Sequence, residues 1–293
     1  MTVTAQSLDV LVSGYASIDE SYHASRLAGA AQTGVLHGPV RPPPRPGGCG
    51  PNTARSLARL GIRVGLVTWL GDDPDGRGFL AGLAEAGVNL TGVELGDGPS
   101  PRSLMIYDAQ GNAACYFHPS GSAAQRMSVE VAGLLSSVPW LALTVGPRAL
   151  TEQLLDRRDS TTRVAWALKA DPEAFPPALC RRLLSADLIC LNHAELTFLT
   201  EALGQPAESG PMDLVEQGAR CVALTRGPDG YTVATRGGAV EVTVEPIAVD
   251  DPSGAGDAFF AGILAGLIRG EEPMDAAANG ARVARAHLQE MPT

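Results

Sequence analysis

Lysine is nearly absent from this 293-residue chain, since Lys169 is the one lysine among 22 basic residues. A P-loop ends in Gly-Lys-Ser or Gly-Lys-Thr, and a protein kinase needs a lysine on its third strand. Lys169 lies in the sequence Ala-Leu-Lys-Ala-Asp and fits neither pattern. The Gly-x-Ser-x-Gly turn of α/β-hydrolases is missing too. Any phosphate bound here must therefore be held by backbone amides, arginines or a metal ion.

Cysteine and histidine are also scarce. The five cysteines include no Cys-x-x-Cys pair and the five histidines no His-Glu-x-x-His, which argues against a disulfide framework or a zinc site. The longest apolar run, at 258–268, is shorter than the roughly twenty residues that a membrane span needs. No basic region precedes an apolar one at the N-terminus, so we expect a cytoplasmic protein.

Acidic residues outnumber basic ones, and the formal net charge is −10. Nucleic acids and anionic membranes would be repelled at long range, so we expect neither as a partner. The composition, 45% hydrophobic and 18% charged, is that of an ordinary globular protein. A chain of this length can bury roughly three quarters of its unfolded surface. The expected partners are therefore small molecules.

Short β-rich runs alternate with amphipathic helical stretches. Strands are expected at 9–12, 64–69, 140–145, 164–168, 188–191, 221–225 and 232–234. Helices are expected at 52–60, 76–86, 173–184, 194–203 and 214–218. This alternation predicts an α/β fold with a central, mostly parallel sheet flanked by helices. Ligands of such sheets bind along the rim formed by the carboxyl ends of the strands.

Two segments interrupt this alternation. Residues 15–46 are loosely patterned and end in a proline-rich run from Arg41 to Pro46. Residues 103–108 and 113–117 flank a turn and read as a β-hairpin. We therefore expect a single domain over residues 1–293, with a small β lid formed by about 15–46 and 96–121.

The sharpest local signal is a glycine loop running from Asp251 to Asp257. We expect a strand at 242–250 before it and a helix that begins at about Asp257. Gly254 and Gly256 permit backbone turns that a side chain would block. Free N–H groups at a helix N-terminus bind anions, and Asp257 could accept a proton beside them. On spacing alone, a tight turn with Asp257 as helix cap is the simpler interpretation.

This loop resembles the second signature of the ribokinase-like (PfkB) carbohydrate kinases, Asp-Thr-x-Gly-Ala-Gly-Asp. The first signature is also matched, by the glycines, asparagine and closing Leu-Gly of residues 47–61. The two motifs occur in the family's order, and the resemblance covers nearly the whole chain. It implies a ribokinase-like fold that transfers the γ-phosphoryl group of ATP to a primary hydroxyl of a sugar or nucleoside. It also implies Mg²⁺ and leaves a monovalent cation open.

The resemblance assigns a role to each matched residue. Asp257 is the implied base, and the backbone amides of Gly254, Ala255 and Gly256 are implied to hold the transferring phosphoryl group. The segment from Gly14 to Asp19 resembles the family's early motif, whose aspartate binds sugar hydroxyls. A carboxylate can accept two hydroxyl hydrogen bonds at once, although Asp19 taken alone reads as a solvated loop residue. The implied acceptor ligands are Asp19, Gly48 and Asn52.

Metal binding is implied for Asn192 and Glu195. They follow a buried strand and match the family's Asn-x-x-Glu, which organises magnesium and phosphate oxygens largely through water. By itself the tetrapeptide is ordinary helix-capping chemistry.

Nucleotide binding is implied for three residues of a glycine turn and one residue of a later helix. The turn resembles the family's Thr-x-Gly-x-x-Gly, although any glycine-closed hairpin gives that pattern. The implied residues are Thr225, Gly227, Gly230 and Asn279.

The chain departs from the family pattern at two places. Pro252 replaces the usual threonine, but a proline suits a fixed-φ position entering a turn. Arg226 stands where the family has a small or aliphatic residue. Its guanidinium either neutralises an ATP phosphate or points to solvent.

The acceptor class follows from the lid. Residues 113–121 are rich in aromatic residues in a chain with only 5% aromatics, and the stretch resembles the lid of bacterial adenosine kinases. Because a flat base stacks on an aromatic side chain, we expect a nucleoside on Phe117, with a simple sugar such as ribose or fructose as the alternative. Tyr116 and Phe117 alternate across the strand, so at most one of them faces the ligand.

Two other classes remain open at this stage. One is a catalytically silent sugar- or nucleotide-binding regulator, although Asp257 argues against it. The other is a Rossmann-type oxidoreductase, although no Gly-x-Gly-x-x-Gly follows the first strand. A homodimer formed through the lid is a further expectation.

Overall fold

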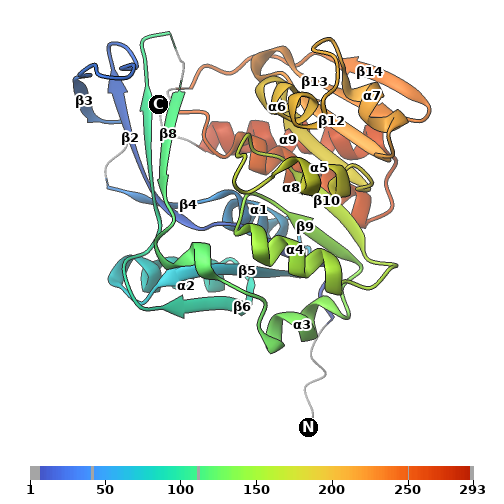
Figure 1. Cartoon of the computed structure of the whole chain (residues 1–293), viewed down its shortest axis with the longest axis horizontal. Coiled ribbons are helices and arrows are strands. Elements are labelled where there is room, and N and C mark those ends of the chain that lie inside the picture. The colour runs from blue at the N-terminus through green and yellow to red at the C-terminus, as the bar shows by residue number, and fades with distance from the viewer. Residues whose placement is uncertain (1–6, 41–42, 111–112, 250, 291–293) are drawn as a thin grey trace.

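The computed structural model describes residues 7–40, 43–110, 113–249 and 251–290. Its centre is a nine-stranded sheet in the order β14-β13-β12-β11-β10-β9-β1-β5-β6 (Figure 1). The pairs from β12 to β6 are parallel, and β13 and β14 are antiparallel at one edge. The strands are β1 (Val10–Ser13), β5 (Val64–Gly71), β6 (Asn89–Gly96), β9 (Trp140–Leu143), β10 (Arg163–Ala167), β11 (Leu188–Asn192), β12 (Cys221–Thr225), β13 (Tyr231–Thr235) and β14 (Gly238–Val242). The predicted α/β class is confirmed.

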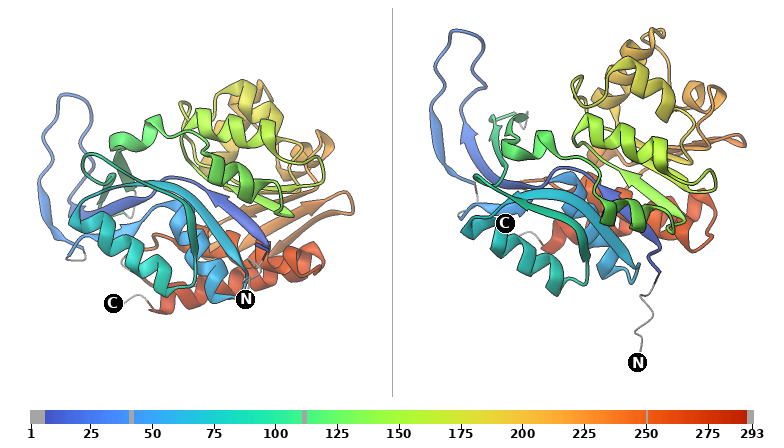
Figure 2. Two further views of the ribbon diagram at one scale, coloured as in Figure 1. Left: turned by 90° about the horizontal axis from the view of Figure 1, so that it is seen from below. Right: turned by 60° about the horizontal axis from the view of Figure 1, so that its bottom comes forward.

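Helices cover both faces of this sheet (Figures 1 and 2). One face carries α1 (Cys49–Arg59), α2 (Pro74–Glu85), α8 (Ala255–Ile268) and α9 (Pro273–Glu290). The other carries α3 (Val129–Leu135), α4 (Arg148–Arg157), α5 (Pro177–Leu183), α6 (His193–Leu203) and α7 (Pro211–Glu216). Within the described ranges, every helix is too short or too polar to span a lipid bilayer.

Each central strand packs against both helical layers because successive side chains point to opposite faces. In β1, Val10 and Val12 join the core under α8, whereas Leu11 joins the core under α4. All three side chains are fully buried. Burying an aliphatic side chain of this size stabilises the fold by about 1.5–3 kcal/mol. The two-sided burial explains why these strands read as continuous apolar runs.

A second sheet of five strands lies beside the first, in the order β3-β2-β7-β8 with β4 paired to β2. Its strands are β2 (Ser17–Ala24), β3 (Leu36–Pro39), β4 (Arg45–Gly47), β7 (Arg102–Tyr107) and β8 (Ala113–His118). Both segments predicted to form the lid contribute to it, and the predicted hairpin is β7–β8. The β2–β3 hairpin extends away from the body (Figure 2). Residues 41–42 and 111–112, on which part of these predictions fell, lie outside the described residues.

Two predicted elements differ from the structure. The strand expected at 242–250 is wrong, since β14 ends at Val242 and residues 243–249 form no regular structure. Pro246, which cannot donate to a sheet ladder, lies in the middle of that run. The helix expected from residue 173 begins at Pro177, after Pro176, because prolines favour the first helical position and disfavour the interior.

Helices α8 and α9 pack closely because glycines meet at their crossing. A Cβ atom added at Gly262 would lie 2.7 Å from the Cα atom of Gly280, which is shorter than any real contact. Gly82, in α2, has open space around its Cα atom. The two positions therefore form a matched pair for testing the crossing.

We expect Gly262→Ala to lower the free energy of unfolding by about 1–3 kcal/mol, because the added methyl group pushes α9 outward. Gly82→Ala should raise it by about 0.5–1 kcal/mol, because alanine loses less backbone entropy in a helix. Urea unfolding of both variants measures the difference. A stabilised Gly262→Ala protein would show that the crossing is looser than described.

Candidate active site

The glycine loop delivers its backbone amides to the N-terminus of α8. Gly254 is the N-cap, in the left-handed conformation with φ 83°. A Cβ atom there would lie 2.8 Å from Nε2 of His287, so only glycine fits. The N–H groups of Gly256 and Asp257 lie in the first turn of α8, where the helix itself offers no carbonyl acceptor. The N–H of Ala255 donates to the carbonyl of Pro252 at 3.2 Å. The expected helix N-terminus is present, with the Ala255 amide engaged in the turn, and anion binding there stays a prediction.

Asp257 lies in the first turn of α8, where Asn52 in α1 donates from Nδ2 to its Oδ2 at 3.0 Å. Burial raises the pKa of Asp257 above its ordinary value, and this effect outweighs the opposing influence of Lys169, Asn52, Cys49 and His287. A carboxylate with a raised pKa is a better proton acceptor. The carboxylate is therefore both oriented and made more basic at the anion-binding terminus.

Cys49, the first residue of α1, lies against the same carboxylate. Burial and the negative charge of Asp257 raise the pKa of the thiol well above its ordinary value. The thiol is therefore neutral near pH 7, and it favours the charged form of the Asp257 carboxyl, whose pKa it lowers. Sequence analysis did not assign Cys49 to the site, because the spacing of the five cysteines suggests no role for it.

The second sheet presents a row of side chains to the site. Asp19 in β2 pairs with Ser103 in β7, which pairs with Phe117 in β8, so the three side chains share one face. The ring of Phe117 lies 4.9 Å from the ring of Tyr15, centroid to centroid. Tyr116 is on the opposite face and 62% exposed. The structure thus brings Asp19 and Phe117 to the same surface.

A pair of glycines makes room for the carboxylate of Asp19. A Cβ atom at Gly47 would lie 1.8 Å from Oδ2 of Asp19. Gly48 has φ 93°, and a Cβ atom there would lie 2.3 Å from the carbonyl oxygen of Tyr15. The glycine pair of the first motif is therefore required by the close approach of β4 to β2 and to the chain after β1. Gly47 is a site residue that the prediction did not include.

The second sheet is also tied to the glycine loop through Asp251, whose side chain is fully buried. Arg45 of β4 donates from Nη2 to Oδ2 of Asp251 at 3.0 Å. The hydroxyl of Tyr107, at the end of β7, donates to Oδ1 at 3.0 Å and lies 2.7 Å from Oγ of Ser253. These contacts fix the loop relative to the face that carries Asp19.

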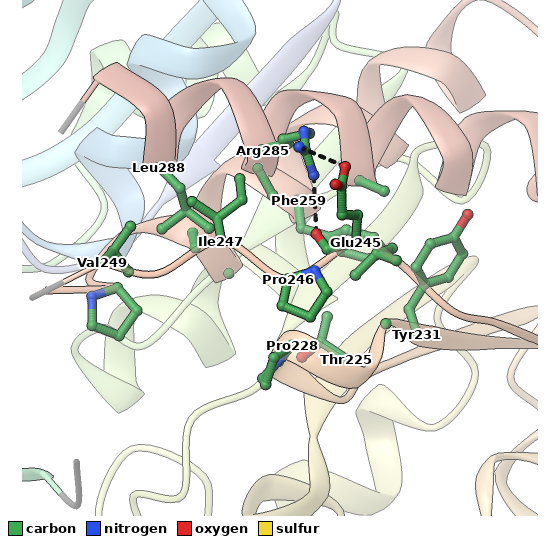
Figure 3. A pocket seen from close by; sticks show the side chains of 18 of the residues that line it. Thr225, Pro228, Tyr231, Glu245, Pro246, Ile247, Val249, Phe259, Arg285 and Leu288 are labelled. Atoms are coloured by element: carbon green, nitrogen blue, oxygen red, sulfur yellow. Dashed lines mark hydrogen bonds and ion pairs between the residues drawn. The ribbon is translucent and has the colours of Figure 1, made fainter.

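A cavity of about 610 Å³ opens beside the glycine loop (Figure 3). Thr225, Gly227 and Gly230 line one side, from the end of β12 and the 3₁₀ turn η2 (Gly227–Asp229). Apolar side chains such as Ile247 and Phe259 line much of the rest, and Arg285 is paired with Glu245 at 3.1 Å. An apolar slot beside an anion-binding helix terminus suits a base attached to phosphates.

The side chain of Asn279 donates to Glu271 and accepts from Arg282 at 2.6 Å, and its role in nucleotide binding stays a prediction. The two alternatives given for Arg226 need correction. Arg226 neither points to solvent nor faces the cavity. Its side chain is 17% exposed and pairs with Glu241 on β14 at 2.7 Å.

Asn192 and Glu195 form a reciprocal capping box at the start of α6. Oδ1 of Asn192 accepts from the N–H of Glu195 at 2.9 Å, and Oε2 of Glu195 accepts from the N–H of Asn192 at 2.8 Å. Oε1 of Glu195 lies 3.0 Å from Nζ of Lys169. Among the described residues, no cluster of three or more His, Cys, Asp or Glu side chains could hold a metal. These oxygens keep spare lone pairs, so they fit Mg²⁺ bridged by water rather than a direct cage.

The chain belongs to the pfkB family of carbohydrate kinases, whose family model matches residues 9–293. These enzymes are phosphotransferases with an alcohol group as acceptor, so the oxidoreductase alternative is excluded. A fructokinase from Klebsiella pneumoniae is 30% identical over 244 residues, covering 76% of each chain. The relationship to carbohydrate kinases therefore rests on sequence as well as on the site.

Solved structures share the fold over nearly the whole chain. Ribokinase from Cryptococcus neoformans var. grubii, in complex with ADP, has a TM-score of 0.77 and 25% identity, covering 95% of this chain and 94% of its own. Adenosine kinase from Sinorhizobium meliloti has a TM-score of 0.79 and 19% identity, covering 96% and 94%. The ribokinase-like fold is thus confirmed.

Asp19 provides a direct test of the site's electrostatics. Burial raises the pKa of its carboxyl to about 6, and the nearby charge of Asp257 adds to this, against the opposing effects of Ser17, Ser103 and Arg45. We expect the carboxyl to titrate near pH 6 when followed by NMR, being protonated below that pH and charged above it. Asp19→Asn should remove that titration and leave the others. A midpoint near pH 4 would show that the carboxyl is hydrated.

Proposed function

We propose that this carbohydrate kinase transfers the γ-phosphoryl group of ATP to a primary hydroxyl, with Asp257 as the base. The observation that carries this proposal is the position of the Asp257 carboxylate. Asn52 orients it at the anion-binding terminus of α8, between the apolar cavity and the second sheet. ATP occupies the cavity, and the acceptor lies under the second sheet, which acts as a lid.

Different residues bind the two substrates. Thr225, Gly227 and Gly230 bind the nucleotide, and first-turn amides of α8 such as that of Gly256 hold the γ-phosphoryl group. Asp19, Gly48 and Asn52 bind acceptor hydroxyls. Lid closure excludes water, which would otherwise compete as the acceptor.

Proton transfer completes the reaction. As the acceptor oxygen bonds to the γ-phosphorus, its proton passes to Asp257, and the bond to the β,γ-bridging oxygen breaks to release ADP. Mg²⁺, when bound with ATP, neutralises charge on the phosphates, and Asn192 with Glu195 would hold its water shell. The resemblance leaves a monovalent cation open.

Replacing the base tests the mechanism. We expect Asp257→Asn to keep ADP affinity and lower kcat by about 10²-fold or more, the span for loss of a general base. The measurement is ADP formation with Mg·ATP against a panel of sugars and nucleosides. The control is Asp275→Asn, which removes the same negative charge from α9, away from the glycine loop. A variant that keeps most of its kcat would leave Asp257 a helix cap.

For the acceptor we propose a nucleoside or another riboside that carries a ring. Tyr15 and Phe117 form an aromatic pair 4.9 Å apart on the side of Asp19, and a free sugar has no flat face to use it. Stacking a base on an aromatic side chain contributes about 1–3 kcal/mol. The resemblance in fold to an adenosine kinase is compatible with this acceptor.

The aromatic pair yields a second prediction. Phe117→Ala should raise KM for the best nucleoside by about tenfold and change KM for a free pentose or hexose by less than threefold. Tyr116→Ala, on the opposite face of the same strand, should affect neither. Equal losses for nucleoside and sugar would mean that Phe117 only packs the lid.

A simple sugar is the second candidate acceptor, because the fructokinase relative shares 30% identity with this chain. Efficient turnover of fructose or ribose with every nucleoside ignored would select it. Turnover of neither class would favour the silent regulator. The single-domain organisation, the cytoplasmic location and a homodimer through the lid stay predictions.

A further inference from the structure

Lys169 lies two residues beyond the end of β10, at the rim where β11 ends in Asn192. Its Nζ is 3.0 Å from Oε1 of Glu195. It also interacts electrostatically with Asp257 and Cys49, which lie on two other elements. The one lysine of the chain is thus placed among the acidic groups of the site, although neither signature motif contains it.

The ammonium of Lys169 is charged and accessible. The carboxylate of Glu195, 3.0 Å from Nζ, favours the charged form. The side chain of Lys169 is 45% exposed, against 8% for Glu195. An ammonium has three N–H donors and Glu195 accepts one of them, so donors and exposed surface remain for a ligand.

The site also needs a cation at this place. Asp257 and Glu195 would repel the terminal phosphoryl group of ATP. The nearby guanidinium groups are engaged with carboxylates, Arg45 with Asp251 and Arg226 with Glu241. His287, which also interacts with Asp257, has its Nε2 2.9 Å from the carbonyl oxygen of Ser253.

We propose that Nζ of Lys169 contacts the terminal phosphoryl group of ATP and stabilises the charge on it during transfer, an inference that rests on the function proposed above. Lys169 remains protonated throughout. The acceptor oxygen bonds to the γ-phosphorus, the acceptor proton goes to Asp257, and ADP leaves with the bridging oxygen. Glu195 then acts as a positioning residue, because it holds the ammonium at the rim.

The competing explanation is that Lys169 only stabilises Glu195 and the start of α6. Nucleotide binding separates the two, since a phosphoryl contact affects ATP and not ADP. Lys169→Met keeps the aliphatic stem without the charge, and Lys169→Arg keeps the charge. Arg182→Met, which breaks an exposed pair with Asp156 on the surface, removes one positive charge elsewhere.

The experiment measures Kd for Mg·ADP and for the non-hydrolysable analogue Mg·AMP-PNP by calorimetry, with thermal unfolding of each variant. For Lys169→Met we expect Kd for AMP-PNP to rise about tenfold and Kd for ADP to change less than twofold. Lys169→Arg should recover at least half of the lost affinity, and Arg182→Met should match the wild type. On the acceptor found by the panel, Lys169→Met should also lower kcat by more than tenfold.

Two results would overturn the inference. One is unchanged AMP-PNP affinity in Lys169→Met, and the other is an equal loss of ADP and AMP-PNP affinity together with a lowered melting temperature. If the wild type binds both nucleotides but phosphorylates no acceptor, the proposed function is wrong. The comparison of Kd for ADP with Kd for AMP-PNP still decides the role of Lys169 in that case.

Discussion

The hydrogen bond from Asn52 to Asp257 joins two motifs that lie 205 residues apart, and the geometry of the site depends on it. It holds the carboxylate at the start of α8 and fixes α1 against α8. The glycines of the first motif and the amides of the second therefore lie on the same side of the site. A buried carboxylate is stable only when such donors satisfy it. Cys49, in the same helix, also favours the charged form of this carboxyl, so α1 is the element that orients Asp257.

Negative charge is the main physical problem of this site. A chain of net charge −10 has to bring an anionic nucleotide next to Asp257, Asp19 and Glu195. Two features reduce the repulsion: the amides at the N-terminus of α8 and the ammonium of Lys169. Because Lys169 is the one lysine of the chain, no neighbouring lysine can replace its charge.

The sequence predicted those parts of the fold that depend on local pattern. The central strands are apolar on both faces, so they were visible as runs, and the glycine motifs were visible because close approach demands glycine. The sequence did not reveal β2 and β6, whose charged outer residues hide the alternation, nor the irregular course of residues 243–249. The electrostatic interactions of Lys169, Cys49 and His287 with Asp257 arise only from tertiary packing, and no spacing in the sequence encodes them.

The buried carboxylate of Asp251 decides which parts of the lid can move. Arg45 and Tyr107 both come from the second sheet and both bond this group, whose side chain is fully buried. Separating them would remove a guanidinium and a hydroxyl donor from a buried carboxylate, which costs several kcal/mol. The base of the sheet, near β4 and the end of β7, is therefore held to the glycine loop. Opening for the acceptor must come from the outer strands, where β8 is an edge and the β2–β3 hairpin extends into solvent. Phe117 lies on that edge strand and Asp19 on a central one, so the aromatic contact with Tyr15 belongs to the part of the second sheet that is less firmly held to the glycine loop.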